Sequence, residues 1–405
     1  MSEWVLGPDR PYPSRIEPLP QRLEDVTAHW LTRLLAPRYP GIEIRRLDVV
    51  ECKNSHTTKL RVRLDLNNVG VSAGIPEHVC VKANWSGLRT GLICEREARF
   101  YHLIGEGLRA PVPEAYFADW DDNGRGNGVV VMEDLALSYG VFGASDDHLG
   151  VDGVAAGLES LARVHAAMWA DPRLERWSWL PRSMGTENDT EQVRDYWNYI
   201  WFNLHDPAYE AVVPAWVYRT PEVMQQALDE LSAWELALPG PRCLVHGDAH
   251  QGNSFLRNDG ERIWVDWQLV RAGSPWRDVS YFLVNSLTVE ERRAADRDLV
   301  EHYRQHLLAA GANNVPSADE AWQRSIRWPA YGTQAWLGNV NQWGQHSGAE
   351  MVERQFAALA DYDTIALLTA GKLPRRRFVP GDGAYPLAPA LRDEMARRAA
   401  SSPHR

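Results

Sequence analysis

Two acidic residues and an asparagine near the middle of the sequence have the spacing of a phosphoryl-transfer site. His246-Gly247-Asp248 is followed by Asn253 and then by Asp266. Phosphoryl transfer needs a carboxylate that positions the attacking hydroxyl and hard oxygen ligands that hold Mg²⁺ on the phosphates. The interval from Asp248 to Asn253 is the one that separates Asp and Asn in a kinase catalytic loop. We therefore predict that Asp248 orients an acceptor hydroxyl and that Asn253 and Asp266 ligate magnesium.

A cation for the inner phosphates of a nucleotide is expected on an upstream strand. The run Val79-Cys80-Val81-Lys82 places a lysine on an apolar strand, where an ammonium group is costly unless it is paired. In the helix that follows, Glu97 has helical spacing with the apolar residue Phe100, so it is expected to point inward and hold Lys82. Glu95 is the alternative partner.

The elements that must position these residues fall into two groups along the chain. The first group is predicted to contain a helix ending near residue 36, strands at 42–50, 59–66 and 78–83, a helix at 92–104, and strands at 115–118 and 128–132. The second is predicted to be mainly helical, with helices at 154–169, 191–204, 221–236, 276–285, 289–310, 318–343 and 349–368 and short strands at 243–245, 254–256 and 263–265. This order predicts an α+β fold.

Composition shifts divide the chain into four predicted segments. Residues 1–22 are rich in proline and predict an extended arm, because proline interrupts regular helix. Residues 23–134 form the predicted smaller, nucleotide-binding lobe, and residues 135–372 the larger lobe with the catalytic loop and the acceptor site. Residues 373–405 contain prolines and an arginine run and predict a surface tail.

Charge and composition exclude several classes of function. The formal net charge of −11 disfavours DNA, RNA or an anionic membrane as the main partner. The four cysteines form no Cys-x-x-Cys pair, so they suggest neither a zinc site nor a disulfide framework. Since no stretch is long and apolar enough to span a bilayer, we expect a cytoplasmic protein. The sequence does not indicate an oligomeric state.

Several of these motifs together resemble those of a known superfamily. The string from His246 to Asp266-Trp267-Gln268, followed by Trp276-Arg277-Asp278-Val279-Ser280-Tyr281-Phe282, is similar to the aminoglycoside phosphotransferase and choline kinase superfamily. It is most similar to the ecdysteroid kinase-like branch. The resemblance also includes residues 27–31, 97–101 and 161–166, and it covers roughly residues 23 to 370.

This resemblance implies a bilobal protein-kinase-like fold. The small lobe would hold an antiparallel sheet and one main helix, and ATP would lie in the cleft beside a larger, mostly helical lobe. The backbone at Glu133, Asp134 and Leu135 would bind the adenine. Asp278 would brace the catalytic loop.

The loop that covers the phosphates departs from the family pattern. The usual glycine-rich sequence is replaced by Asn54-Ser55-His56-Thr57-Thr58, which contains no glycine. Hydroxyl and backbone N–H groups can still contact phosphate, so Ser55 and Thr57 are predicted nucleotide-binding residues.

Aromatic residues of the second lobe give the remaining indication of the acceptor. The chain contains 18 tryptophans, an outlier in an otherwise ordinary composition. These rings either fill the core or line a broad apolar pocket, with side-chain amides as hydrogen-bonding groups. The predicted substrate-binding residues are Trp197, Trp201, Gln268, Trp336 and Trp343.

The expected function is an ATP- and Mg²⁺-dependent kinase of a small molecule with a hydroxyl group. Rings and amides suit a terpenoid, steroid or polyketide-like alcohol, whereas an aminoglycoside would require clustered carboxylates. Choline-like acceptors stay open, because an aromatic cage binds quaternary amines. A non-catalytic binding protein of the same fold is the other alternative. His165, on an apolar helix, is interpreted as a core histidine.

Overall fold

A computed structural model describes most of the chain. The described residues are 18–54, 57–85, 92–121, 126–145, 147–182, 197, 200–201, 203–204, 207–338, 348–370 and 372. Most of the predicted arm, all of the predicted tail over 373–405 and much of the predicted helix over 191–204 lie outside these residues. No helix within the described ranges is long and apolar enough to cross a membrane.

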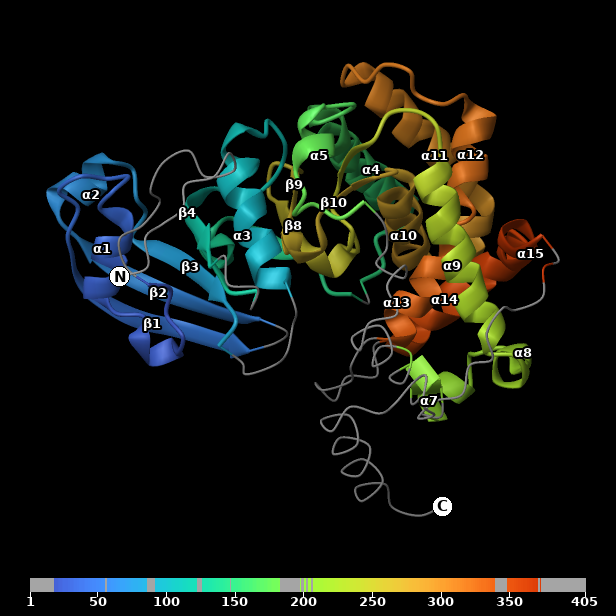
Figure 1. The fold of residues 1–405 in the computed structure, drawn as a ribbon, viewed down its shortest axis with the longest axis horizontal. Coiled ribbons are helices and arrows are strands. Elements are labelled where there is room, and N and C mark those ends of the chain that lie inside the picture. Colours follow the sequence, from blue (N-terminus) through green and yellow to red (C-terminus); the bar gives the residue numbers. More distant parts are fainter. Residues whose placement is uncertain are drawn as a thin grey trace, which may run out of the picture.

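The first lobe is built on a five-stranded antiparallel sheet (Figure 1). Its strands are β1 (Ile44–Asn54), β2 (Thr58–Leu66), β3 (His78–Ala83), β4 (Ala115–Trp120) and β5 (Gly128–Glu133). They lie in the order β1-β2-β3-β5-β4, and each neighbouring pair is antiparallel. The helices of this lobe are α1 (Ala28–Leu35), α2 (Asn68–Ser72) and α3 (Ile93–Leu103).

Alternation along β2 sorts its side chains between the two faces of the sheet. Leu60 and Val62 are buried in a hydrophobic cluster that also contains Leu31 of α1. Because successive residues of a strand point to opposite faces, Lys59 and Arg61 lie on the other face. That face is the one that carries Lys82 on β3, and it is turned toward the second lobe.

Helix α3 is the main helix of the first lobe and packs against both lobes. Its residues Ala98 and Phe100 are completely buried in a cluster that continues into the second lobe. The ring of Phe100 stacks on Trp267 of the second lobe, with centroids 4.2 Å apart. The position of α3 is therefore fixed by packing on both sides.

The second lobe is mainly helical, as the sequence predicts (Figure 1). Its helices are α4 (Gly150–Ala167), α5 (Arg173–Arg176), α7 (Pro207–Glu210), α8 (Ala215–Arg219), α9 (Glu222–Ala237), α10 (Trp276–Ser286), α11 (Val289–Ala309), α12 (Ala318–Ser325), α13 (Pro329–Leu337), α14 (Gly348–Asp361) and α15 (Thr364–Thr369). Its strands are β6 (Gly140–Phe142), β7 (Cys243–Val245), β8 (Ser254–Arg257), β9 (Arg262–Trp264) and β10 (Arg271–Gly273). Short 3-10 turns include η3 (Leu135–Leu137), η4 (Gln251–Asn253) and η5 (Trp267–Leu269). The predicted α+β fold is confirmed.

Two helices of the second lobe are divided where the sequence predicts continuity. Within the helix expected over 318–343, the described residues form two helices, α12 and α13, because Pro329 lies in the first turn of a new helix. The helix expected over 349–368 divides into α14 and α15 at Asp363, which has a left-handed backbone conformation with φ 52°. Strands β6 and β10, of three residues each, were not predicted from the sequence.

Candidate active site

Lys82 lies at the centre of a charged cluster between the two lobes. Its Nζ is 2.8 Å from Oε1 of Glu97 on α3 and 2.7 Å from Oδ1 of Asp266 in the second lobe. The Lys82 and Glu97 side chains are almost completely buried, and Asp266 is 12% exposed. The structure thus brings together three residues that the sequence predicts for one site.

The ionisation of this cluster follows from burial and charge together. Burial alone would lower the pKa of Lys82, but the charges of Asp266 and Glu97 outweigh it and raise that pKa. Burial opposes ionisation of Asp266, yet the nearby Lys82 and Lys59 ammonium groups hold the pKa of Asp266 well below its usual range. For Glu97, burial dominates and raises the pKa. The lysine and Asp266 therefore form a charged pair at neutral pH.

The backbone around Asp266 joins this cluster to the second lobe. Asp266 follows β9 and has a left-handed conformation, with φ 68° and ψ 57°. The next residue, Trp267, donates its backbone N–H to Oε1 of Glu97 at 3.1 Å. One glutamate oxygen therefore contacts both Lys82 and the turn that follows the metal-ligand candidate. Such strained backbone is frequent at functional sites.

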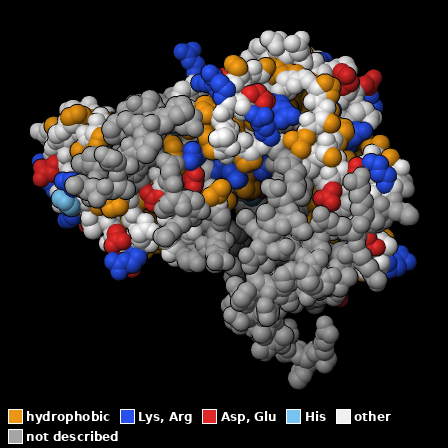
Figure 2. Space-filling model, viewed as in Figure 1, with side chains coloured by type: hydrophobic (Ala, Val, Ile, Leu, Met, Phe, Trp, Pro, Cys, Tyr) orange, Lys and Arg blue, Asp and Glu red, His pale blue; other side chains and the backbone are white. Residues whose placement is uncertain are grey.

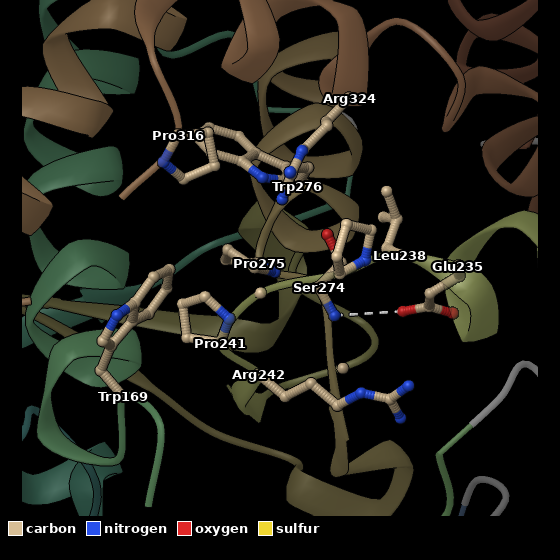
Figure 3. A pocket seen from close by; sticks show the side chains of 13 residues that line it. Trp169, Glu235, Leu238, Pro241, Arg242, Ser274, Pro275, Trp276, Pro316 and Arg324 are labelled. Atoms are coloured by element: carbon tan, nitrogen blue, oxygen red, sulfur yellow. Dashed lines mark hydrogen bonds between the residues drawn. The ribbon is translucent and has the colours of Figure 1, made fainter. Parts of the chain in front are cut away.

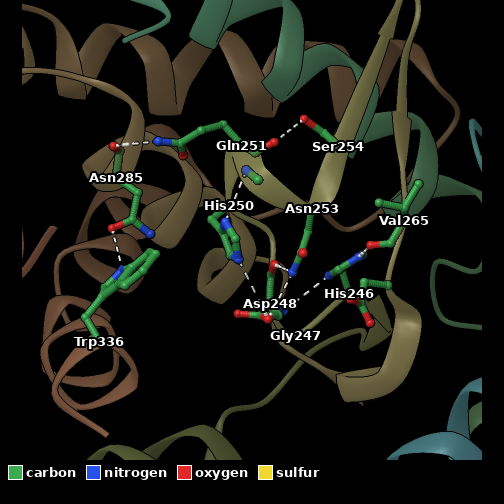
Figure 4. A network of polar contacts seen from close by, with 12 residues as sticks. His246, Gly247, Asp248, His250, Gln251, Asn253, Ser254, Val265, Asn285 and Trp336 are labelled. Atoms are coloured by element: carbon green, nitrogen blue, oxygen red, sulfur yellow. Dashed lines mark hydrogen bonds and ion pairs between the residues drawn. The ribbon is translucent and has the colours of Figure 1, made fainter. Parts of the chain in front are cut away.

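The predicted catalytic loop places Asp248 beside Asn253 (Figure 4). The Asn253 amide Nδ2 donates to Oδ2 of Asp248 at 3.0 Å and to the Asp248 backbone carbonyl at 3.0 Å. The ring of His246 bonds to the carbonyl of Val265 at 2.8 Å, and the Val265 N–H donates to the Asn253 carbonyl. These bonds tie the loop to the strand that leads into Asp266.

Asp278 braces the start of this loop, as the family resemblance implies. Its two oxygens accept the backbone N–H groups of His246 and Gly247 at 2.7 and 3.0 Å. Gly247 has a φ of +87°, and a Cβ there would lie 2.2 Å from the carbonyl oxygen of Leu269, so only glycine fits. His165 is completely buried and bonds to Oδ2 of Asp278 at 3.2 Å. The interpretation of His165 as a satisfied core residue is confirmed.

His250 lies next to Asp248 and is held by its own loop. Its Nε2 is 3.9 Å from Oδ2 of Asp248, and its Nδ1 accepts the N–H of Gly252 at 3.1 Å. Burial lowers the pKa of His250, so the ring is neutral at pH 7. Its ring meets Trp336 edge-on, with centroids 5.4 Å apart.

The predicted adenine-binding segment connects the lobes directly after β5. The carboxylate of Asp134 accepts two bonds from Nε of Arg61, at 2.9 and 3.0 Å, and caps η3 through the N–H of Ala136. The Asp134 side chain is therefore already hydrogen-bonded within the protein, so the backbone groups of this segment are the ones that can bind the adenine. Glu133 pairs with Val79 in the sheet, and Leu135 is buried.

The predicted phosphate-covering loop is described only in part. Ser55 lies outside the described residues. Thr57 is 1% exposed, and the hydroxyl of Thr58 donates to Oδ1 of Asn54 at 2.8 Å. The end of this loop is therefore packed against the protein where β2 begins.

One cation of the site was missed from the sequence. Lys59 on β2 lies directly opposite Lys82 on β3, and its Nζ is 3.3 Å from Oδ2 of Asp266. The signal was present in the alternating run from residue 59 to 64, in which every second residue is basic. The pairing register that sets Lys59 beside Lys82 is not visible in the sequence alone.

The predicted substrate-binding residues are mostly buried. Trp197 and Trp336 are 3% and 4% exposed, and Trp201 packs partly buried against the same core. Gln268 is half-buried, and Trp343 lies outside the described residues. Burial of Trp197 favours the packing alternative, whereas Trp336 touches His250 beside the catalytic loop. The substrate role of these residues stays a prediction.

A separate surface pocket lies elsewhere in the second lobe (Figure 3). It is lined by residues that include Trp169, Glu235, Arg242 and Trp276. The buried Glu235 accepts the N–H of Ser274 at 3.1 Å, and burial raises the pKa of this glutamate. No predicted site residue lines this pocket.

A buried Lys-Glu-Asp cluster joins an antiparallel sheet to a helical lobe, and that lobe carries the Asp-Asn loop beside it. This combination defines a phosphotransferase of the protein-kinase-like fold. The model of the ecdysteroid kinase-like family matches residues 93–312, more than half of the chain. The chain belongs to the ecdysteroid kinase-like family and so is a small-molecule kinase. The predicted branch of the superfamily is confirmed.

Solved structures of similar architecture come from several small-molecule kinases. Ethanolamine kinase from Plasmodium vivax is 12% identical, with a TM-score of 0.45 over 80% of this chain and 84% of that one. Choline kinase LicA from Streptococcus pneumoniae is 15% identical, with a TM-score of 0.45 over 82% and 98% of the two chains. A choline/ethanolamine kinase family protein from Mesorhizobium loti is 15% identical, with a TM-score of 0.42 over 82% and 94%. Among curated proteins, none matches the chain.

Proposed function

We propose that this enzyme transfers the γ-phosphoryl group of Mg-ATP to a hydroxyl of a small, largely apolar or amphipathic molecule. Terpenoid, steroid and polyketide-like alcohols are the acceptors we favour. The observation that carries the proposal is the contact of one buried lysine with Glu97 of the first lobe and Asp266 of the second. A lysine and a carboxylate in contact between two lobes support the proposal, because phosphoryl transfer needs a cation on the phosphates and a ligand for their metal.

Two oxygen donors fit a magnesium ion. The Asn253 amide nitrogen is used by Asp248, so its amide oxygen is the atom that remains for a metal. Asp266 supplies a carboxylate that stays ionised, and both are hard ligands of the kind Mg²⁺ prefers. Magnesium, when bound, would neutralise charge on the phosphates. Lys82 would bind the inner phosphates, and Glu97 would orient Lys82.

Asp248 is the residue that orients the acceptor hydroxyl. Its carboxylate is held by Asn253 on a loop whose backbone is fixed by Asp278, so its position is set before substrate binds. A carboxylate in this position accepts a hydrogen bond from the acceptor hydroxyl and turns its oxygen toward the phosphorus. In this proposal, the lobe of residues 23–134 binds the nucleotide and the lobe of residues 135–372 binds the acceptor.

Rings close to the catalytic loop support an apolar acceptor. His250, beside Asp248, meets Tyr281 and Trp336 edge-on, and Tyr281 in turn meets Tyr331. A cationic acceptor would be stabilised by carboxylates, whereas the groups packed around His250 are buried rings with a few polar atoms. Aminoglycoside and choline-like acceptors are the alternatives.

A screen of acceptors tests the proposal. Purified protein would be incubated with Mg-ATP and a panel of terpenoid, steroid and polyketide alcohols, aminoglycosides and choline, and products would be followed by mass spectrometry. Gain of one phosphate by an apolar alcohol is the expected result. Gain only by an aminoglycoside or choline would overturn the acceptor class. A folded protein that binds no Mg-ATP in calorimetry would instead favour a non-catalytic binding protein.

A further inference from the structure

We propose that Lys59 is a second phosphate-binding residue, which contacts the outer phosphates of ATP in place of a glycine-rich loop. This inference rests on the proposed use of Mg-ATP. It assigns a role to a residue on a neighbouring strand of the sheet, separate from the lysine on β3.

Lys59 and Lys82 hold the two oxygens of one carboxylate. Lys82 Nζ is 2.7 Å from Oδ1 of Asp266, and Lys59 Nζ is 3.3 Å from Oδ2. The two lysines are direct partners in the antiparallel pairing of β2 and β3, so their side chains leave the same face of the sheet. Lys59 is 40% exposed and Lys82 only 4%. Lys59 therefore approaches the site from its open side.

The charges of the cluster explain why Lys59 needs a further anion. Lys82 has two carboxylate partners, Glu97 and Asp266. In the part of the chain that the structure describes, Asp266 is the only ion-pair partner of Lys59. If Asp266 turns its oxygens to a divalent cation, Lys82 keeps Glu97, whereas Lys59 loses its partner. A phosphate oxygen on the same cation would replace that partner.

The sequence of the neighbouring loop favours such a phosphate contact by a lysine. Glycine-rich loops bind phosphate through backbone N–H groups, which requires close approach without side chains. The segment 54–58 contains no glycine, and Thr57 at its end is buried. Charged side-chain donors are then a further means to hold the outer phosphates, beside the hydroxyl and backbone N–H groups of this loop. In the space-filling view, Lys, Arg, Asp and Glu side chains adjoin hydrophobic ones between the two lobes (Figure 2).

Calorimetry with nucleotides of different phosphate number tests this role. Affinities for AMP, Mg-ADP and Mg-ATP would be measured for the wild type, Lys59→Met, Lys59→Arg and the control Lys372→Met. The control removes an equivalent charge from the second lobe, where Lys372 pairs with Glu230. We expect Lys59→Met to weaken Mg-ATP binding about tenfold or more and to leave AMP binding unchanged. Lys59→Arg should restore most of the loss, and the control should bind as the wild type.

Three outcomes would overturn the assignment, and they have different meanings. Unchanged Mg-ATP affinity in Lys59→Met would mean that this lysine only neutralises Asp266. An equal loss for AMP and Mg-ATP would mean that the substitution disturbs the lobe as a whole. A wild type that binds none of the nucleotides would remove the proposed function itself, and the Lys59 role with it.

A second inference comes from an independent cluster on the helices α4 and α11. We infer that Glu159, His302 and His306 form a binding site for a divalent transition metal such as Zn²⁺. His302 Nε2 is 3.0 Å and His306 Nε2 is 3.6 Å from the same oxygen, Oε1 of Glu159. The ligand atoms of the three residues all lie within 4.8 Å of one another.

The two carboxylate–imidazole distances of this cluster are compatible with a tetrahedral metal. Ligands about 2.0 to 2.1 Å from zinc in a tetrahedron are separated by about 3.3 Å, between the two distances observed here. The histidines are four residues apart on one helix, so both rings lie on the same side. All three side chains are partly exposed, which leaves a fourth ligand position to water. Imidazole and carboxylate are suitable donors for zinc.

A metal here would clamp the helix pair that supports the catalytic loop. Helix α4 carries His165 and α11 carries Tyr303, and these two side chains bond at 2.8 Å. His165 in turn contacts Asp278, which braces the loop. Metal binding between the same helices should therefore stabilise the fold without contacting the reacting groups.

Zinc calorimetry and thermal unfolding test this second site. The wild type should bind one equivalent of Zn²⁺ with a micromolar or lower Kd and show a higher Tm with zinc. His302→Ala with His306→Ala should lose at least tenfold in zinc affinity and all of the Tm rise, whereas His29→Ala, at an exposed histidine elsewhere, should keep both. Equal zinc affinity in the double variant, or only millimolar binding by the wild type, would overturn the site.

Discussion

At the scale of single residues, Asp266 shows how a buried carboxylate stays ionised and able to bind a metal. A buried carboxylate is costly, and its cost is offset here by two ammonium groups and a backbone turn. The same environment keeps it ionised, which is the state that a metal requires. Asp266 therefore contributes both to the closure of the cluster and to the proposed metal site.

The depressed pKa of Asp266 predicts how stability depends on pH. Its pKa in the folded protein lies below the value of about 3.9 in an unfolded chain, so its stabilising contribution is present above that pH and is lost as the pH falls. In Asp266→Asn this loss is absent. We expect the variant to be less stable than the wild type at pH 7. Between roughly pH 5 and pH 3, however, its free energy of unfolding should fall by about 1 kcal/mol less than that of the wild type.

Urea unfolding at a series of pH values measures this difference. Asp298→Asn, at an exposed position of α11, is the matched control and should follow the wild type. If the unfolding free energies of the wild type and Asp266→Asn fell equally as the pH is lowered, the Asp266 carboxylate would not be held at a low pKa.

At the scale of elements, close packing of α4 on α10 supports the catalytic loop. Gly157 of α4 faces Phe282 of α10, and a Cβ at this glycine would lie 2.3 Å from the ring. The same two helices carry His165 and Asp278, which meet at 3.2 Å. A change in the separation of these helices would therefore reach the loop that holds Asp248.

Gly157→Ala should separate α4 from α10. Although alanine favours helix, the overpacking is expected to cost about 1 to 3 kcal/mol in unfolding free energy. Gly107→Ala is the control, since a Cβ there meets no atom within 4 Å. Chemical denaturation gives the two values, and a Gly157→Ala variant as stable as the wild type would contradict the packing account.

The elements that could be predicted from the sequence are those with strong local patterns. The strands around residues 59–66 and 78–83 alternate or are continuously apolar, and the helix that carries Glu97 has a clear apolar face. The division at Pro329 was not predicted, because proline is equally consistent with a kink and with the first turn of a new helix. Tertiary packing decides between them.

At the scale of the whole molecule, the site is assembled from both lobes. Lys59, Lys82 and Glu97 come from the first lobe, while Asp248 and Asp266 come from the second. Their residue types and order indicated a site, but the register that adds Lys59 depends on pairing between strands. The burial of Trp197 likewise follows from the packing of distant helices, which local patterns do not specify.

A ligand that binds between the lobes should stabilise the whole fold. Mg-ATP at about 100 times its Kd should add ~2.7 kcal/mol to the unfolding free energy and raise the Tm. Because Asn253 and Asp266 are the proposed metal ligands, ATP with a chelator should raise the Tm less than Mg-ATP does. Differential scanning fluorimetry makes this comparison, and a Tm that does not respond to Mg-ATP would argue against nucleotide binding in the cleft.

The most direct test of the central claim compares the wild type with Asp248→Asn on the acceptor found by screening. Both proteins should fold and bind Mg-ATP with similar affinity, because Asp248 is proposed to act on the acceptor hydroxyl. Turnover, measured as phosphorylated product by mass spectrometry, should fall by about a hundredfold or more in the variant. Asp259→Asn, in the exposed turn between β8 and β9, should keep wild-type turnover. Equal turnover in Asp248→Asn and the wild type would contradict the account.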